Sequence, residues 1–208
     1  AKEGDPPALP EEPEPPVEKI ATSVSAVVVP SKVDAATKAT AVAVVSGAET
    51  GKVQFRANGK LVATANVKGG EARASFALKV GTHQITAQFV ENATHLGSVS
   101  KAKKLTVVKA ASKITSVKAA KKSLKRSKTF SITVKVSPKS LAAKGTVEIR
   151  YAGKKVGSAK VNSKGVAKVK VKASKLGKKK GTKKLSVRFE KTSQLKASKK
   201  VMVTVRVK

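Results

Sequence analysis

Residues 51–63 read GKVQFRANGKLVA and residues 145–157 read GTVEIRYAGKKVG, so one pattern occurs twice in this chain. A second pair of similar blocks follows in the same order, GTHQITAQF at 81–89 and GTKKLSVRF at 181–189. The first pair is offset by 94 residues and the second by 100. A period of that size is too long for a solenoid unit and matches one small domain.

Both copies also end alike, in KLTV at 104–107 and MVTV at 202–205, which gives a third offset of 98 residues. We take Val107 and Val205 as equivalent on this basis. The chain is therefore expected to hold two copies of one module: a first repeat (residues 20–108) and a second repeat (residues 109–208).

Within each block, apolar and polar residues alternate with a period of two, which is typical of strands with one buried face. Val53 and Phe55 fall on one side, while Asn58-Gly59 is a strong signal for a two-residue hairpin turn. Many short runs of this kind, spaced by glycine, serine and lysine, predict an all-β sandwich. The predicted strands are 23–29, 40–45, 52–57, 60–67, 71–80, 83–90, 102–108, 114–119, 128–136, 146–151, 154–161, 165–173, 183–190 and 200–207.

Residues 1–19 differ from the rest in composition, with six of the eight prolines and six acidic residues. Proline removes backbone donors and the carboxylates repel one another, so this segment is predicted to be a disordered, extended linker. We expect it to join the repeats to an upstream domain of the same polypeptide, or to an envelope or virion assembly.

The charge is very uneven. The chain has a formal net charge of +33, of which the linker contributes −4, the first repeat +7 and the second repeat +30. No stretch approaches the ~18 consecutive apolar residues of a membrane helix. The chain has no cysteine, which excludes disulfides, thiolate metal sites and cysteine nucleophiles.

Catalytic and metal-binding patterns are lacking in the sequence. His83 and His95 are the only histidines and are interpreted as solvated side chains, since a zinc site needs three or four converging ligands. Glu148 and Glu190 are the only acids of the second repeat, and we expect them to form cross-strand ion pairs rather than a catalytic pair. Asn92 begins an Asn-Ala-Thr glycosylation triplet of a kind that often arises by chance. We predict that the chain is not an enzyme and binds no cofactor or metal.

The shared pattern resembles the bacterial immunoglobulin-like repeat domains of secreted and surface proteins. It consists of G-x-V-x-[FI], a G-K hairpin, G-T-x-x-[IL]-x-[AV]-x-F and a terminal T-V strand. The residues that carry it in the first repeat are Gly51, Val53, Phe55, Gly59, Gly81, Thr82, Ile85, Phe89, Thr106 and Val107. Those in the second repeat are Gly145, Val147, Ile149, Gly153, Gly181, Thr182, Leu185, Phe189, Thr204 and Val205.

This resemblance implies two tandem Ig-like Greek-key β-sandwich domains, secreted or at the cell surface, that act as a spacer or an adhesive appendage. Two other assignments stay open. The chain could be an auxiliary module that holds nucleic acid behind a secreted nuclease or hydrolase, or a phage virion surface protein that attaches to a host. The fold alone does not decide among them.

The lysine-rich surface of the second repeat is the candidate binding site. It is either a solvated, self-repelling face or a surface that binds polyanions, and the charge alone favours neither. The candidate residues are Lys121, Lys122, Lys125, Arg126, Lys168, Lys170, Lys172, Lys175, Lys178, Lys179, Lys180, Lys183 and Lys184. Lysine contacts phosphates as a point charge and the repeat has few arginines or aromatics for reading bases, so the expected ligand is a cell-wall polymer or a nucleic-acid backbone held without sequence specificity.

Overall fold

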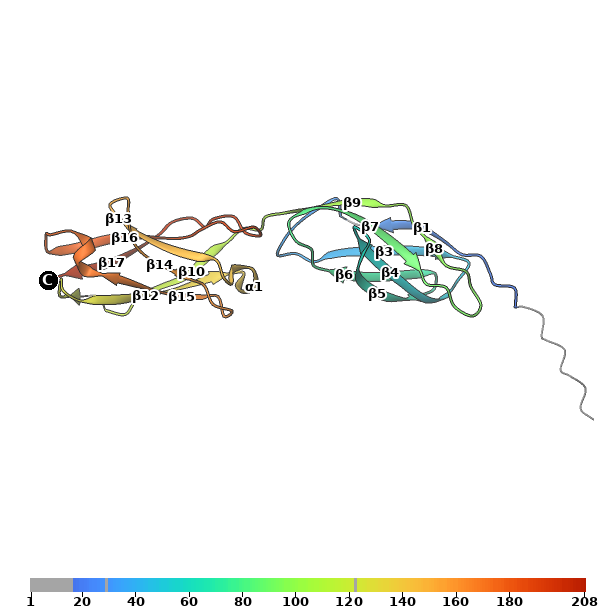
Figure 1. Ribbon diagram of the computed structural model, residues 1–208, viewed down its shortest axis with the longest axis horizontal. Coiled ribbons are helices and arrows are strands. Elements are labelled where there is room, and N and C mark those ends of the chain that lie inside the picture. The colour runs from blue at the N-terminus through green and yellow to red at the C-terminus, as the bar shows by residue number, and fades with distance from the viewer. Residues whose placement is uncertain (1–16, 29, 122) are drawn as a thin grey trace, which may run out of the picture.

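The computed structural model describes residues 17–28, 30–121 and 123–208, with the side chains of 26–28 left undescribed. Most of the predicted linker therefore lies outside the described residues. Figure 1 shows two bodies of strands joined end to end by one crossing of the chain. The first repeat supplies β1 to β9 and the second repeat supplies β10 to β17.

The elements of the first repeat are β1 (Ser23–Val28), β2 (Lys32–Asp34), β3 (Ala39–Ser46), β4 (Thr50–Ala57), β5 (Lys60–Lys68), β6 (Glu71–Phe76), β7 (Gly81–Phe89), β8 (Ser98–Val99) and β9 (Lys103–Val108). Those of the second are β10 (Lys113–Ala119), β11 (Ser123–Leu124), β12 (Thr129–Ser137), α1 (Lys139–Ala142), β13 (Thr146–Tyr151), β14 (Lys154–Lys160), β15 (Val166–Lys172), a 3-10 turn η1 (Ala173–Leu176), β16 (Gly181–Phe189) and β17 (Val201–Val207).

Both repeats arrange their strands in the same order. In the second repeat a three-stranded sheet, β10-β12-β15, accompanies a five-stranded sheet, β11-β17-β16-β13-β14. In the first repeat the matching strands, β1-β3-β6 and β5-β4-β7-β9-β2, are joined into one sheet through the Lys68↔Glu71 pair. β2 and β11 pair in parallel with the last strand of their repeats. The predicted all-β Ig-like sandwich fold is confirmed.

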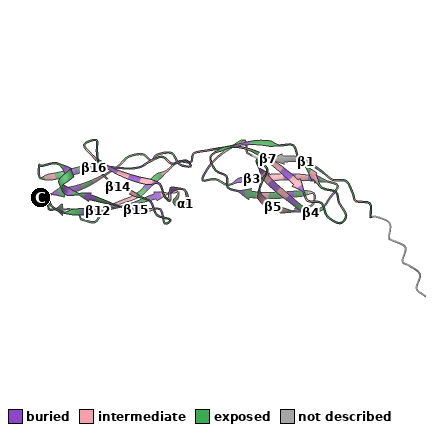
Figure 2. Cartoon of the chain, in the orientation of Figure 1, coloured by how far each residue is buried: buried purple, intermediate pink, exposed green. Residues whose placement is uncertain are grey.

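Period-two alternation produces the cores. Val53, Phe55, Val147 and Ile149 are fully buried, and buried residues alternate with exposed ones along the strands in Figure 2. Burial of a large apolar side chain contributes about 1.5–3 kcal/mol, so each alternating strand is a substantial part of its core. The predicted strand 71–80 ends earlier, at Phe76, and the chain then turns toward β7.

The hairpin turns follow the sequence prediction. Asn58 and Gly59 have φ angles of 49° and 77°, and Ala152 and Gly153 have 46° and 78°, so both turns use two left-handed residues. The arginine shared by both repeats braces this turn, because Arg56 Nη1 donates to the Gly59 carbonyl at 3.2 Å, as Arg150 does to Gly153 at 2.9 Å. The repeated arginine is therefore explained by the fold.

The glycine that opens each repeated block is explained by packing. A Cβ added at Gly51 would lie 2.6 Å from the ring of Phe89, and one at Gly145 would lie 2.5 Å from the ring of Phe189. Both rings are fully buried. Each glycine therefore lets the strand approach a fully buried phenylalanine ring of its repeat.

One equivalence drawn from the sequence is wrong. Gly81 pairs with Val107 and Gly181 pairs with Val207, so the partner of Val107 in the second repeat is Val207 rather than Val205. The error is a shift of two residues. Such a shift keeps every side chain on the same face, so alternation could not reveal it.

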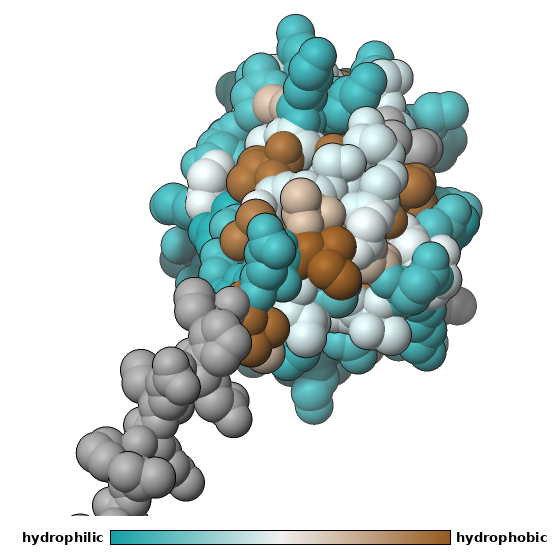
Figure 3. Space-filling model, turned by 90° about the vertical axis from the view of Figure 1, so that its right-hand side faces the viewer, coloured by the Kyte–Doolittle hydropathy of each residue, from teal (hydrophilic) through white to brown (hydrophobic). Residues whose placement is uncertain are grey.

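The segment that enters each repeat is tied to the same loop. Ile20 forms an isolated bridge with His95, and Ala110 forms one with Leu195. In the second repeat, the loop that contains Leu195 also contacts the first repeat, because Val80 N donates to Gln194 Oε1 at 3.0 Å. The corresponding end of the first repeat, seen in Figure 3, gathers apolar side chains among polar ones; Ile20 is 55% exposed there.

Candidate functional site

Two basic runs that are about fifty residues apart in the sequence meet at the far end of the second repeat. Arg126 Nη1 donates to the Lys178 carbonyl at 3.3 Å, and Ala173 N donates to the Lys128 carbonyl at 3.0 Å. We call the exposed cations of these loops the basic end, which is made up of Lys121, Lys125, Arg126, Lys128, Lys175, Lys178, Lys179 and Lys180. The candidate Lys122 lies outside the described residues.

The loop that carries part of the basic end is longer than its counterpart in the first repeat. It covers residues 173–180 in the second repeat and only 77–80 in the first. It is anchored by η1, in which Leu176 is fully buried. The loop ends at Lys180, because β16 begins at Gly181, two residues before the predicted strand 183–190.

A second cluster covers the outer side of the three-stranded sheet. Lys168, Lys170 and Lys172 are exposed on β15, as predicted, and lie opposite hydroxyl residues of β12 in the order Thr133, Ser131, Thr129. Two further exposed lysines, Lys118 on β10 and Lys135 on β12, share this side. We call these five lysines the basic face.

Lys118 and Lys135 were not predicted as site residues from the sequence. Alternation with buried Val134 and Val136 was the signal that places Lys135 on the outer side. Only the pairing of β10 with β12 and of β12 with β15 brings Lys118 beside the β15 lysines.

Lys183 and Lys184 do not belong to either cluster. Lys184 is exposed, but on β16 of the five-stranded sheet. The assignment of Lys183 to the lysine-rich surface is wrong, because Lys183 is only 7% exposed and its Nζ lies 5.7 Å from the centre of the Tyr151 ring. Lys183 and the buried Leu185 are two residues apart on β16. Because side chains alternate between the two faces of a strand, both point inward.

The acidic residues of the second repeat lie on the other sheet. Glu148 forms ion pairs with Arg150, at 2.5 Å, and with Lys155 on the neighbouring strand, at 3.2 Å, which confirms the expected cross-strand pairing for this residue. Partial burial opposes its ionisation, but hydrogen bonds from Lys155 and Arg150 outweigh that effect and lower the pKa of Glu148. Among the described residues, no ion pair involves the basic end or the basic face.

Glu190 and Glu148 line one shallow depression with Arg150 and Arg188. Glu148 and Arg188 are opposite each other in register. In the described part of the chain, Glu190 forms no ion pair, so the cross-strand role expected for it is not seen there. The depression is therefore lined by both carboxylates and cationic side chains, unlike the basic end, which is made up of cations alone.

The two histidines are half-buried rather than fully solvated. His83 Nε2 is 2.8 Å from the Lys79 carbonyl, and His95 Nδ1 is 2.8 Å from Thr94 Oγ1. Over the described ranges, no group of three or more metal-binding side chains occurs.

Asn92 Oδ1 accepts hydrogen bonds from the backbone of Thr94 and His95, which fixes the loop of the glycosylation triplet. No helix in the described residues is long and apolar enough to cross a membrane.

The chain was compared with known families and structures. Residues 24–108 match the bacterial Ig-like domain family (group 3). No curated protein sequence matches the chain.

Three solved structures are similar at low identity. The Clostridium thermocellum CbhA fibronectin(III)-like modules are 20% identical over 88% of this chain and 94% of theirs, with a TM-score of 0.34. The Ca2+-stabilized adhesin of an Antarctic bacterium is 14% identical over 92% of this chain and 50% of its own, with a TM-score of 0.33. The Escherichia coli adhesin FdeC is 17% identical over 90% of this chain and 64% of its own, with a TM-score of 0.38. This chain thus spans about half to two thirds of the two adhesin chains.

Proposed function

We propose that this chain, in which residues 24–108 form a bacterial Ig-like domain, is a non-catalytic structural and adhesive module of a secreted or surface protein. In this proposal the first repeat is a spacer and the second repeat binds anionic cell-wall polymers, such as teichoic acids or acidic glycans, with low specificity. The repeats act as two tandem domains, 20–108 and 109–208. Their matching strand orders and the single chain crossing between them support this division.

The observation that carries the proposal is the meeting of two separate lysine-rich runs at the basic end. A surface kept basic only for solubility does not require the two runs to come together. The basic face continues from this end through the Thr129↔Lys172 pair, so both clusters form one cationic surface. Thirty excess positive charges on one repeat oppose folding by self-repulsion, which a bound polyanion would relieve.

The test is binding of the full chain to purified poly(glycerol phosphate) teichoic acid at several salt concentrations. We expect the logarithm of the binding constant to fall linearly with the logarithm of salt concentration, as counterions are released. Reversal of Lys178, Lys179 and Lys180 to Glu should weaken binding by about tenfold or more. The matched control reverses three exposed lysines of the first repeat, Lys52, Lys60 and Lys68, and should change binding by less than about threefold.

Equal losses from the two triple variants would contradict the proposal, as would binding that does not respond to salt. Nucleic acid is the second polymer to test. Binding of duplex DNA that is much tighter than teichoic acid binding, at equal phosphate concentration and salt, would favour the nuclease-associated alternative instead.

A further inference from the structure

A cavity of about 500 Å³ opens at the basic end, where the chain leaves one sheet for the other. The pairing of β10 with β12 ends near Ala119, and a last backbone bond joins Ala120 N to the Ser131 carbonyl at 2.8 Å. The chain then crosses to the five-stranded sheet, where β11 pairs with β17. This crossing leaves the space over β12 uncovered. Its volume is within the range of small-molecule sites.

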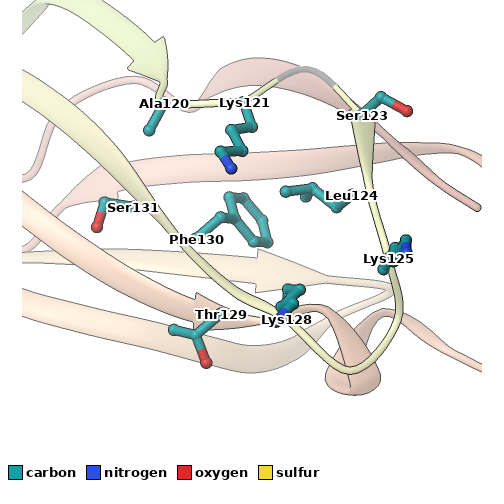
Figure 4. Close-up of a pocket in the computed structure, with 9 residues that line it drawn as sticks. All are labelled: Ala120, Lys121, Ser123, Leu124, Lys125, Lys128, Thr129, Phe130 and Ser131. Atoms are coloured by element: carbon teal, nitrogen blue, oxygen red, sulfur yellow. The ribbon is translucent and has the colours of Figure 1, made fainter.

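The lining of this cavity combines cationic and apolar side chains, which Figure 4 shows. Its floor is apolar, with the ring of Phe130 and the side chain of Leu124, each only 4% exposed. Lys121 points into the cavity toward the Phe130 ring. Lys125 and Lys128 also line it, together with Thr129 and Ser131, whose side chains point away from the Phe130 ring. None of the described residues that line it is acidic.

This combination specifies the ligand more narrowly than charge does. The lysines call for an anionic group, and the Phe130–Leu124 floor calls for an apolar surface. A pyranose ring that carries a carboxylate has both, because its C–H face is apolar while its carboxylate is charged. A polyphosphate backbone offers charge but no apolar ring.

We infer that this cavity binds one acidic sugar residue of an anionic glycan. The inference rests on the proposed polyanion-binding function and deepens it, because it assigns the basic end to recognition of the ring and the basic face to attraction of the polymer by charge alone.

The test compares two probes on the full chain by calorimetry: a galacturonate tetramer and a linear polyphosphate of about the same charge. One variant changes Lys121, Lys125 and Lys128 to Gln. Its matched control removes the same charge from the basic face, by changing Lys168, Lys170 and Lys172 to Gln. We expect the cavity variant to weaken galacturonate binding by about tenfold and the control by less than about threefold. Both should weaken polyphosphate binding by similar factors.

A second variant, Ala120→Trp, fills the cavity edge without changing charge, at an exposed position. It should weaken galacturonate binding by about fivefold or more and leave polyphosphate binding unchanged. Circular dichroism checks its fold, and the two lysine variants test the inference independently. Equal losses of galacturonate binding in both lysine variants would overturn the inference while the proposed function stands. Failure of the full chain to bind either probe would overturn both.

Discussion

The outer side of one sheet shows how the two repeats differ. In the first repeat, β6 carries Arg73 paired with Glu71 at 3.0 Å, and Ser75 bonded to Thr40 on β3 at 2.9 Å. The matching strand of the second repeat, β15, carries three of the five lysines of the basic face, Lys168, Lys170 and Lys172, none of which forms an ion pair within the described residues. The same backbone therefore supports a balanced surface in one repeat and a cationic surface in the other. Surface charge can change in this fold without a change of topology.

The cores differ in a compensated way. Ala39 on β3 lies opposite Phe76 on β6, whereas Phe130 on β12 lies opposite Val171 on β15. All four are buried. The aromatic ring has moved to the other strand of the pair, so each core keeps one large and one smaller side chain at this position. In the second repeat this move places the ring on the floor of the cavity.

Exchange of the aromatic ring in the first repeat tests this compensation. Phe76→Ala should destabilise the protein by about 3–5 kcal/mol, because it removes a buried ring and leaves a cavity. Adding Ala39→Phe should recover at least about 1 kcal/mol, since the new ring fills the same space from the opposite strand. Urea unfolding followed by circular dichroism measures both. Further loss in the double variant would show that the two cores are not interchangeable.

The glycines under the core rings give the next comparison. Gly145→Ala should cost about 2–3 kcal/mol, because the new Cβ clashes with Phe189. Gly51→Ala should cost more, since Gly51 also has a φ of 133°. Fluorescence of Tyr151 measures the Gly145 variant, because it is the only tyrosine and the chain has no tryptophan, and urea unfolding followed by circular dichroism measures the two variants of the first repeat. Gly69→Ala is the control, with no neighbouring atom within 4 Å, and only the left-handed cost of about 1 kcal/mol applies.

The hairpin turns differ by one residue, Asn58 against Ala152. Ala152→Asn should stabilise the second repeat by about 0.5–1 kcal/mol, because asparagine tolerates the left-handed conformation better than alanine. Asn58→Ala should lose about 1–2 kcal/mol, since the Asn58 side chain also accepts a hydrogen bond from Gln84 N at 2.8 Å. Thermal unfolding of both variants measures these changes in stability. A loss of stability in Ala152→Asn would contradict the assignment of a left-handed turn conformation to residue 152.

The smallest effect concerns acid sensitivity. The pKa of Glu148 is lower in the folded state than the ordinary 4.5, so its contribution to stability is present above pH 4.5 and is lost as the pH falls through the folded pKa. The matching residue, Gln54, does not titrate. Glu148→Gln should therefore flatten the fall in stability of the second repeat below pH 4.5, by less than about 1 kcal/mol, in urea titrations at several pH values. An unchanged slope would contradict this role.

Local patterns were sufficient to predict much of the fold. The alternation around Phe55 and Ile149 and the Asn58-Gly59 turn specify long strands and hairpins through contacts near in sequence. β2 and β11 were missed, because two or three residues cannot show a period and their pairing with the last strand is long-range.

The candidate site was only partly visible. The sequence showed the basic runs and the outward lysines of β15. It could not show that Arg126 reaches the loop of Lys178, since that contact depends on how the sheets close at the end of the sandwich. The cavity over Phe130 was missed for the same reason, because it exists only where the chain crosses between sheets.

The parallel pairs at the end of each repeat have a mechanical consequence. When the chain is pulled by its two ends, β2 and β11 are drawn toward the N-terminal end and their partners, β9 and β17, toward the C-terminal end. The hydrogen bonds between the paired strands are therefore loaded together in shear. Three residue pairs join β2 to β9, but only two join β11 to β17. We therefore expect the second repeat to unfold first under tension, so the repeat that we propose binds the polymer would also limit the force that the chain withstands.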